Sequence, residues 1–410
     1  FRVRGLRTRY RYPGVGAPLP ASLARPEGGE LPPGARFIPK GLRVPVTAFL
    51  RIDDPRAQLE RGALVGRLEL LAEDRDAALE VDGQVVPRES ENSSSLAFML
   101  EGSEIWNFGL AGFRLGDFLP DTAVERLVML HPYQPGRIPL VLVHGTFSSP
   151  ATWAELVNEL QNDPEIASRY QPWLFIYPTG NPIAFSAGVL VESLQQARAA
   201  LDPEGRDPAL DRMVVVGHSQ GGLLAKLTVV DSGDRFWRNV SRRSLEALAL
   251  EPESELLLRR SLFFTPQPFV RRVVFMATPH GGSFLSDFRV ASWISRLVKT
   301  PATLAKLAFD VATIGGDEIY LRSLDRLPTS LDNMASHNPF LRALRDLPIA
   351  PGVPAHSIIA VRGGPPPEGR GDGVVRFESA RLEGVESELV VDSGHSVQMQ
   401  QRAIQELRRI

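Results

Sequence analysis

The stretch MVVVGHSQGGLL, residues 213–224, decides the fold of this chain. It begins with four apolar residues, three of them valine, which is typical of a buried strand. Beyond Gly221 the apolar residues recur with a helical period, so the chain must turn sharply from strand to helix. Such a turn strains its central residue, Ser219, and leaves little space two positions to either side, where Gly217 and Gly221 stand. The pattern G-x-S-x-G in this setting predicts a serine hydroxyl raised above the edge of a sheet.

Strands and helices alternate on both sides of this turn. Strands are expected over residues 138–143, 173–177, 212–216, 270–276, 357–361 and 388–391, and helices over 152–162, 186–200, 221–230 and 396–409. This alternation predicts a mostly parallel central sheet with helices on both faces. Ligands of such sheets bind at the carboxyl ends of the strands.

Two long connections, residues 231–268 and 283–355, interrupt the alternation. The second carries several apolar and aromatic side chains at helical spacing, Trp293 among them. Long connections usually have a functional role, so we interpret both as cap or lid insertions and expect Trp293 to border the substrate. Ordinary packing of these segments on the body is the alternative.

The first third of the chain has a different character. Residues 1–43 read as an extended arm, with five arginines in the first twelve positions followed by a loop-like stretch rich in Pro and Gly. Residues 44–137 read as a β-rich extension joined to the core. Strands are expected there over 44–52, 64–71, 77–86 and 96–100, the middle two as a pair, with a hairpin turn signal at Asp82-Gly83. The catalytic domain is then expected over residues 138–410.

Composition narrows the functional classes. The 410 residues carry a formal net charge of −2, which argues against a basic surface that binds nucleic acid. There is no cysteine, so disulfides and thiolate chemistry are excluded. No run approaches 18 apolar residues, so no transmembrane segment is predicted. Because the sequence begins at Phe1 rather than Met, we expect a trimmed or mature form.

A serine hydroxyl becomes a good nucleophile only when a base takes its proton. In a strand–turn–helix setting of this kind, the partners follow the serine in the order acid, then histidine. His395 directly follows the last predicted strand and is the predicted base. Asp372, in GRGDGVV after the strand over 357–361, is the predicted acid. Its rivals are Glu368, Glu378 and Asp392, the last of which we expect to cap the final helix.

Two backbone N–H donors are needed where negative charge develops on the reacting carbonyl. Gln220 supplies one directly after the serine, and the loop VHGTF over residues 143–147 supplies the other. Thr146 is the expected second donor, or Phe147 if the loop is turned by one residue. His144 is expected to orient this loop. Phe147 and His218 are also expected to border the substrate.

Four segments resemble the α/β-hydrolase superfamily, and within it the bacterial lipase and carboxylesterase branch. They are VHGTF at 143–147, GHSQGG at 217–222, ATPHGG at 277–282, and DGVV at 372–375 followed by His395. The resemblance covers about residues 138–410 and implies an α/β-hydrolase fold. In lipases of this type the Asp of D-G-V-V is the triad acid and the His follows some two dozen residues later; here 23 residues separate them. The resemblance also implies Thr146 as the oxyanion donor.

The whole chain is also similar to bacterial exported hydrolases, including esterases active on polyesters. This similarity implies a periplasmic, lipoprotein-anchored or secreted protein. The expected reaction is hydrolysis of a small-molecule, lipid or polymer ester through an acyl-enzyme on Ser219, with no cofactor. Some related lipases bind a structural calcium, but we do not expect one here, because the sequence shows no clear cluster of calcium ligands. An acyltransferase or amidase with the same triad, or a non-catalytic binding protein, are the alternatives.

Overall fold

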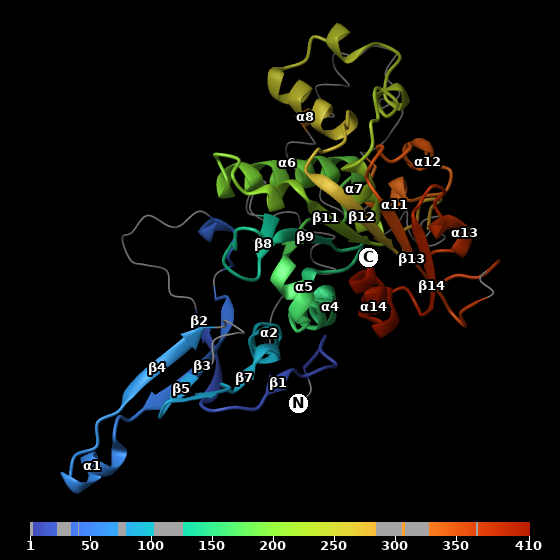
Figure 1. Ribbon diagram of the computed structural model, residues 1–410. Coiled ribbons are helices and arrows are strands. Elements are labelled where there is room, and N and C mark those ends of the chain that lie inside the picture. Colours follow the sequence, from blue (N-terminus) through green and yellow to red (C-terminus); the bar gives the residue numbers. More distant parts are fainter. Residues whose placement is uncertain are drawn as a thin grey trace.

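The computed structural model describes residues 3–22, 34–39, 41–72, 79–101, 126–283, 306–307, 328–365 and 368–410. Its main body is a central sheet with helices on both sides, and a β-rich N-terminal part extends away from this body (Figure 1).

The central sheet contains seven strands in the order β14-β13-β12-β11-β9-β10-β8. All neighbours are parallel except β8, which lies antiparallel to β10 at one edge. The strands are β8 Leu127–Met129, β9 Ile138–Val143, β10 Tyr170–Phe175, β11 Met213–His218, β12 Val270–Met276, β13 Ala355–Val361 and β14 Ser387–Asp392. The predicted mostly parallel sheet is therefore confirmed.

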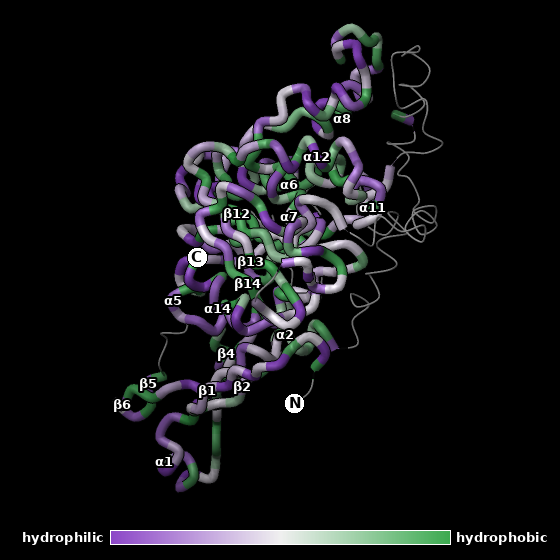
Figure 2. Tube along the Cα trace, turned by 90° about the vertical axis from the view of Figure 1, so that its right-hand side faces the viewer, coloured by the Kyte–Doolittle hydropathy of each residue, from purple (hydrophilic) through white to green (hydrophobic). Residues whose placement is uncertain are grey.

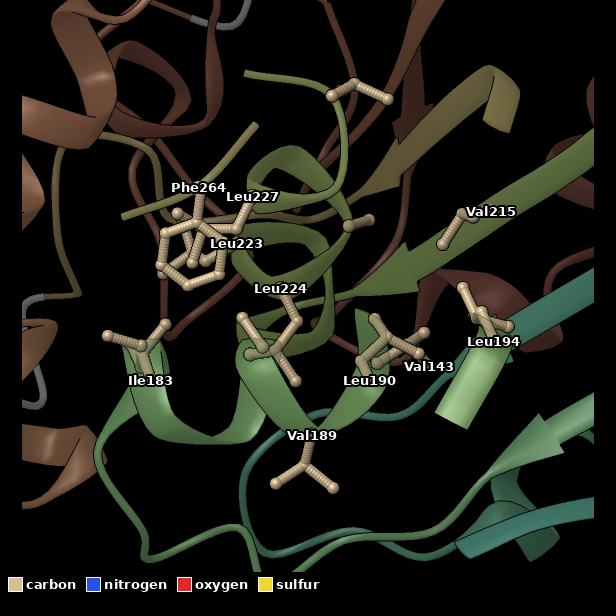
Figure 3. Close-up of a cluster of buried hydrophobic side chains, with 14 of the residues drawn as sticks. Val143, Ile183, Val189, Leu190, Leu194, Val215, Leu223, Leu224, Leu227 and Phe264 are labelled. Atoms are coloured by element: carbon tan, nitrogen blue, oxygen red, sulfur yellow. The ribbon is translucent and has the colours of Figure 1, made fainter. Parts of the chain in front are cut away.

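Alternate side chains of the central strands enter two separate cores. Val141, Val143 and Val215 pack with helices α6 (Ile183–Leu201) and α7 (Gln220–Leu227) on one face. Leu142 and Val216 pack with α4 (Ala154–Gln161) and α14 (Gln401–Arg409) on the other face. Figure 3 shows part of the first core, with Val143, Leu190, Leu194, Val215, Leu223 and Leu224 among its labelled side chains. Because each fully buried side chain of this kind contributes roughly 1.5–3 kcal/mol, the first core fixes α6 and α7 against one face of the sheet, and the second fixes α4 and α14 against the other.

The remaining helices flank this framework. They are α5 Pro164–Arg169, α8 Pro252–Leu262, α11 Ser330–Asn333, α12 Pro339–Asp346 and α13 Phe377–Ala380. Figure 2 shows apolar segments at β12 to β14 in the middle of the body. The first insertion, residues 231–268, packs on the body, because Leu257, Leu258 and Phe264 belong to the same core as α6. Trp293 and most of the second insertion lie outside the described residues.

The N-terminal part corrects three expectations. The stretch expected to be loop-like contains β2 (Ala17–Ser22), which pairs with β3 (Arg43–Arg51). The strand β4 (Arg67–Ala72) pairs with β3 and not with residues 77–86. Residues 77–86 instead contain a hairpin of β5 (Leu79–Val81) and β6 (Gln84–Val86), because Asp82-Gly83 turns the chain back on itself; both turn residues have positive φ.

The strand expected over residues 96–100 is also wrong. These residues belong to helix α2 (Asn92–Leu100), which packs on β2 and β3. Leu96, Ala97 and Leu100 are buried together on one helical face. The Ser93 hydroxyl donates to Asn158 Oδ1 at 2.7 Å and so ties the helix to α4. A short apolar run does not distinguish helix from strand, and here tertiary packing decides.

The arm and the short elements complete this part of the molecule. Strand β1 (Arg11–Tyr12) pairs with β7 (Ser90–Glu91), and α1 (Pro55–Glu60) lies between β3 and β4. Arg9 and Arg11 form ion pairs with Glu91 and Glu89, so these two basic side chains of the arm are satisfied within the chain.

Candidate active site

The backbone at Ser219 has φ 54° and ψ −125°, a left-handed conformation that side chains rarely adopt. Its N–H donates to Met276 O at 2.8 Å and its C=O accepts from Gly222 N–H at 2.9 Å. The strained turn is therefore fixed by β12 on one side and by the first turn of α7 on the other.

The glycines around Ser219 allow α7 to approach the sheet closely. A Cβ at Gly217 would overlap the carbonyl oxygen of Gly221, and a Cβ at Gly221 would overlap that of Val143. A Cβ at Gly145 would lie 2.7 Å from Ser219 Cβ, so the preceding loop also passes close to the serine. Glycine at these positions is thus a steric requirement of the turn.

Three predicted residues from different loops meet at this edge of the sheet. His395 Nε2 lies 2.9 Å from Ser219 Oγ, and His395 Nδ1 lies 2.7 Å from Asp372 Oδ2. Because an ionised carboxylate only accepts hydrogen bonds, Nδ1 carries the ring proton. Nε2 is then free to accept the proton of the serine hydroxyl.

The loop after β13 orients the Asp372 carboxylate. The side chain is 1% exposed, and its Oδ1 accepts from Val374 N–H at 2.7 Å and Val375 N–H at 2.8 Å. Only Oδ2 is left to face the histidine. Backbone donors thus hold the carboxylate in one orientation and satisfy it in a buried position.

Two of the three rival acids have other partners. Glu378 accepts from Gly369 N–H and Asp392 accepts from Gly363 N–H, each at 2.7 Å. The expectation that Asp392 caps the final helix is wrong, because α14 begins only at Gln401 and Asp392 ends β14.

The loop after β9 lies beside the first turn of α7. The Thr146 hydroxyl donates to Gln220 Oε1 at 2.5 Å and so links the two predicted oxyanion donors. Phe147 has φ 53°, and its N–H donates to Thr179 Oγ1 at 3.3 Å. The N–H of Phe147 is thus engaged elsewhere, which favours Thr146 over Phe147 as the second donor. The Phe147 side chain is 40% exposed.

His144, at the start of this loop, is fully buried, and its expected orienting role stays a prediction. Its ring Nδ1 lies 3.2 Å from Gly145 O, and burial lowers its pKa to about 4. The Tyr177 hydroxyl donates to His144 O at 2.7 Å, and the two rings lie 4.7 Å apart. Sequence reasoning missed Tyr177 and Thr179. Their position just after β10 could have indicated them, because neighbouring parallel strands such as β9 and β10 end at the same edge of the sheet.

The structure places His218 differently from the expectation that it borders the substrate. The side chain is 5% exposed, and Nε2 lies 2.8 Å from the carbonyl oxygen of His395. His218 therefore contacts the predicted base from within the core.

The model of the Alpha/beta hydrolase family matches residues 140–408, most of the chain. The chain belongs to the α/β hydrolase family. The resemblance inferred from the four sequence motifs is thereby confirmed at the level of the superfamily. No curated protein matches the sequence. Within the described part of this α/β hydrolase, no helix combines the length and apolarity that crossing a membrane requires.

Several solved structures are similar to this α/β hydrolase at low sequence identity. The mature lipase BlEst2 of Bacillus licheniformis has 15% identity and a TM-score of 0.39, covering 72% of this chain and 95% of that one. A lipase-esterase related protein of Clostridium acetobutylicum has 12% identity and a TM-score of 0.35, covering 66% and 93%. Phospholipase PlaB of Legionella pneumophila has 14% identity and a TM-score of 0.34, covering 60% and 45%.

Proposed function

We propose that this α/β hydrolase cleaves carboxylic esters through an acyl-enzyme on Ser219. The observation that carries the proposal is the continuous hydrogen-bonded chain from Asp372 through His395 to Ser219, with distances of 2.7 and 2.9 Å. A serine, a correctly protonated imidazole and a buried carboxylate in this order are the requirements of nucleophilic acyl transfer.

In the first half-reaction Ser219 Oγ attacks the ester carbonyl carbon, and the hydroxyl proton passes to His395 Nε2. The carbonyl π electrons move to the oxygen, whose negative charge is stabilised by the backbone N–H groups of Gln220 and Thr146. When the intermediate collapses, the bond to the alkoxy oxygen breaks. The leaving alcohol takes the proton from His395, and the acyl group stays on Ser219.

The second half-reaction repeats these steps with water. Water gives a proton to His395 Nε2 and attacks the acyl carbon, and the bond to Ser219 Oγ then breaks as the serine regains its proton. Asp372 stays ionised throughout and stabilises the imidazolium that forms twice in each cycle.

The proposed substrates are small-molecule, lipid or polymer esters with an acyl or aromatic group of moderate size, polyester fragments included. The exposed Phe147 side chain, two residues after the Gly145 that approaches Ser219, supports an apolar contact on the substrate. We also propose that the protein acts outside the cytoplasm, in accord with its similarity to exported hydrolases.

The test is hydrolysis of p-nitrophenyl acetate and p-nitrophenyl palmitate by the wild type and by Ser219→Ala. Ser168→Ala, which changes a serine on the surface helix α5, is the matched control. Removal of Ser219 should lower kcat by a factor on the order of 10⁴ or more, while the control keeps wild-type rates. Circular dichroism checks that all three are folded. A folded wild type inactive on both esters, or a Ser219→Ala variant as active as its parent, would refute the proposal.

Product analysis with added alcohol separates hydrolysis from acyl transfer. The free acid should dominate over the new ester when water and alcohol compete. Predominant formation of the new ester would assign the chain to acyl transfer instead.

A further inference from the structure

A second hydrogen bond joins the segments that carry the serine and the histidine. His218 is the last residue of β11 and immediately precedes Ser219. Its Nε2 lies 2.8 Å from the backbone carbonyl oxygen of His395, while the adjacent Ser219 Oγ lies 2.9 Å from the His395 ring. Two neighbouring residues thus hold His395 at two points, one on its main chain and one on its ring.

From this geometry we infer that His218 is a positioning residue for His395. By fixing the main chain of His395, it sets the point from which the ring reaches both Ser219 and Asp372. The inference rests on the proposed function, because it concerns the histidine assigned there as the base. It gives His218 a different role from the expected substrate contact.

The other hydrogen bonds of the His395 loop do not supply this link. Val397 N–H donates to His395 O at 2.9 Å, but that bond closes a turn within the loop. Ser393 N–H donates to Val361 O at 3.3 Å and so ties the start of the loop to β13. A carbonyl oxygen has two lone pairs, so His395 O can accept from Val397 and from His218 together. The bond from His218 ties the same carbonyl to the strand that carries the nucleophile.

The surroundings of His218 hold its ring in one state. Because the carbonyl only accepts, Nε2 must carry the proton, and the buried Nδ1 has no hydrogen-bond partner within the described part of the chain. The His218 and His395 rings lie 4.9 Å apart, and the fully buried Trp153 presents its ring perpendicular to His218 at 6.4 Å. Burial is the main reason that the pKa of His218 is lowered to about 3, and the charge of the neighbouring His395 is the second reason. A neutral ring there does not oppose the positive charge that His395 gains during the reaction.

Two amides test which ring nitrogen matters. In His218→Gln the amide nitrogen falls near the position of Nε2 and can still donate to His395 O. In His218→Asn the amide is one methylene shorter, falls near the position of Nδ1 and cannot reach that oxygen. His218→Phe keeps the ring volume beside Trp153 but removes the donor.

Steady-state hydrolysis of p-nitrophenyl acetate measures kcat and KM for the three variants. His218→Phe and His218→Asn should lower kcat about 10- to 100-fold, because a small displacement of a catalytic group costs this much. Their KM should stay within threefold of the wild type. His218→Gln should retain kcat within fivefold. Melting temperatures identify the folded variants, and if the Phe variant does not fold, the comparison of Gln with Asn still decides.

Three outcomes would overturn the inference. An equal loss of kcat in the Gln and Asn variants would show that donation to His395 O is not the operative feature. A raised KM with unchanged kcat would assign His218 to substrate contact. A His218→Phe variant with wild-type kcat would show that His218 does not position His395. The proposed esterase activity would not be affected by that result.

A second assay separates this inference from the proposed ester hydrolysis. A fluorophosphonate phosphonylates an activated serine: the oxygen forms a bond to phosphorus, fluoride leaves, and the hydroxyl proton passes to the histidine. Labelling rates of Ser219 that follow the same order, with Asn and Phe slow and Gln near wild type, would support the role of His218 even if no ester were hydrolysed. Equal labelling rates in all variants would refute it.

Discussion

Replacing Asp372 with asparagine tests the proton arrangement of the site. The N–H groups of Val374 and Val375 both point at Oδ1, so the amide oxygen of the introduced asparagine must take that position. The amide NH₂ then faces His395 Nδ1, where the carboxylate accepted a hydrogen bond at 2.7 Å. Nδ1 must now accept, and the ring proton moves to Nε2, which can no longer take the serine proton. The wrong tautomer in an otherwise intact triad costs a factor on the order of 10⁴ in kcat.

The assay is p-nitrophenyl acetate hydrolysis by Asp372→Asn, with Asp392→Asn as its matched control. Asp392 also lies at the end of the sheet and also accepts a backbone N–H, from Gly363. Asp392→Asn should keep kcat within threefold of the wild type, and both variants should show native circular dichroism. An Asp372→Asn variant that retained more than about a tenth of the wild-type kcat would refute the tautomer argument. So would an equal loss in the control.

Three further predictions concern Gly222 in α7, the Thr146 hydroxyl and the buried His144. Gly222→Ala should lower the free energy of unfolding, measured in urea, by about 1–3 kcal/mol, because the new Cβ overlaps Thr278 Oγ1. The double variant with Thr278→Ala should recover part of this loss. If the losses of the two single variants simply added in the double variant, the contact would be contradicted. Thr146→Val removes the hydroxyl bonded to the neighbouring oxyanion donor and should lower kcat about tenfold with native stability, whereas wild-type kcat would show that this bond does not position the donors. The pKa of His144 is lowered to about 4, so the unfolded chain binds its proton near pH 6.5 while the folded chain does not. This contribution to stability is complete above pH 6.5 and is lost as the pH falls toward 4, by about 3 kcal/mol in all. His144→Gln should flatten the fall of the unfolding free energy over that range, and replacing the exposed His337 by Gln should leave it as in the wild type.

The central sheet could be predicted from the sequence because its strands are buried on both faces. Their continuous apolar runs, such as residues 138–143 and 213–216, have no polar alternation that another arrangement would require. The N-terminal part could not be predicted as well. There short strands leave the pairing partner open, since β4 pairs with β3 and β1 pairs with β7, and the helix over residues 92–100 carries no strong amphipathic pattern.

The candidate site, like the fold, has a part that could be predicted from the sequence and a part that could not. Ser219, Asp372 and His395 were predictable because each stands at a fixed place relative to a strand, and the structure brings all three together. The partners of the loop after β9 were harder to identify, because Thr179 and Tyr177 act through single hydrogen bonds that leave no motif, and only their position just after β10 indicates them. The contact between His218 and His395 spans 177 residues, and no local signal in the sequence indicates it.

The strand order of the sheet also determines when the site can form as the chain is synthesised. The serine directly follows the central strand β11, but its proposed acid and base follow β13 and β14, the last two strands of the described residues. The histidine is 176 residues further along than the serine, a delay of roughly nine to thirty-five seconds at ribosomal speed. Throughout that interval the serine has no base to take its proton. On the proposed function, a nascent chain that still lacks His395 therefore cannot hydrolyse an ester through Ser219, and this activity begins only after the segment that follows β14 has been made and folded.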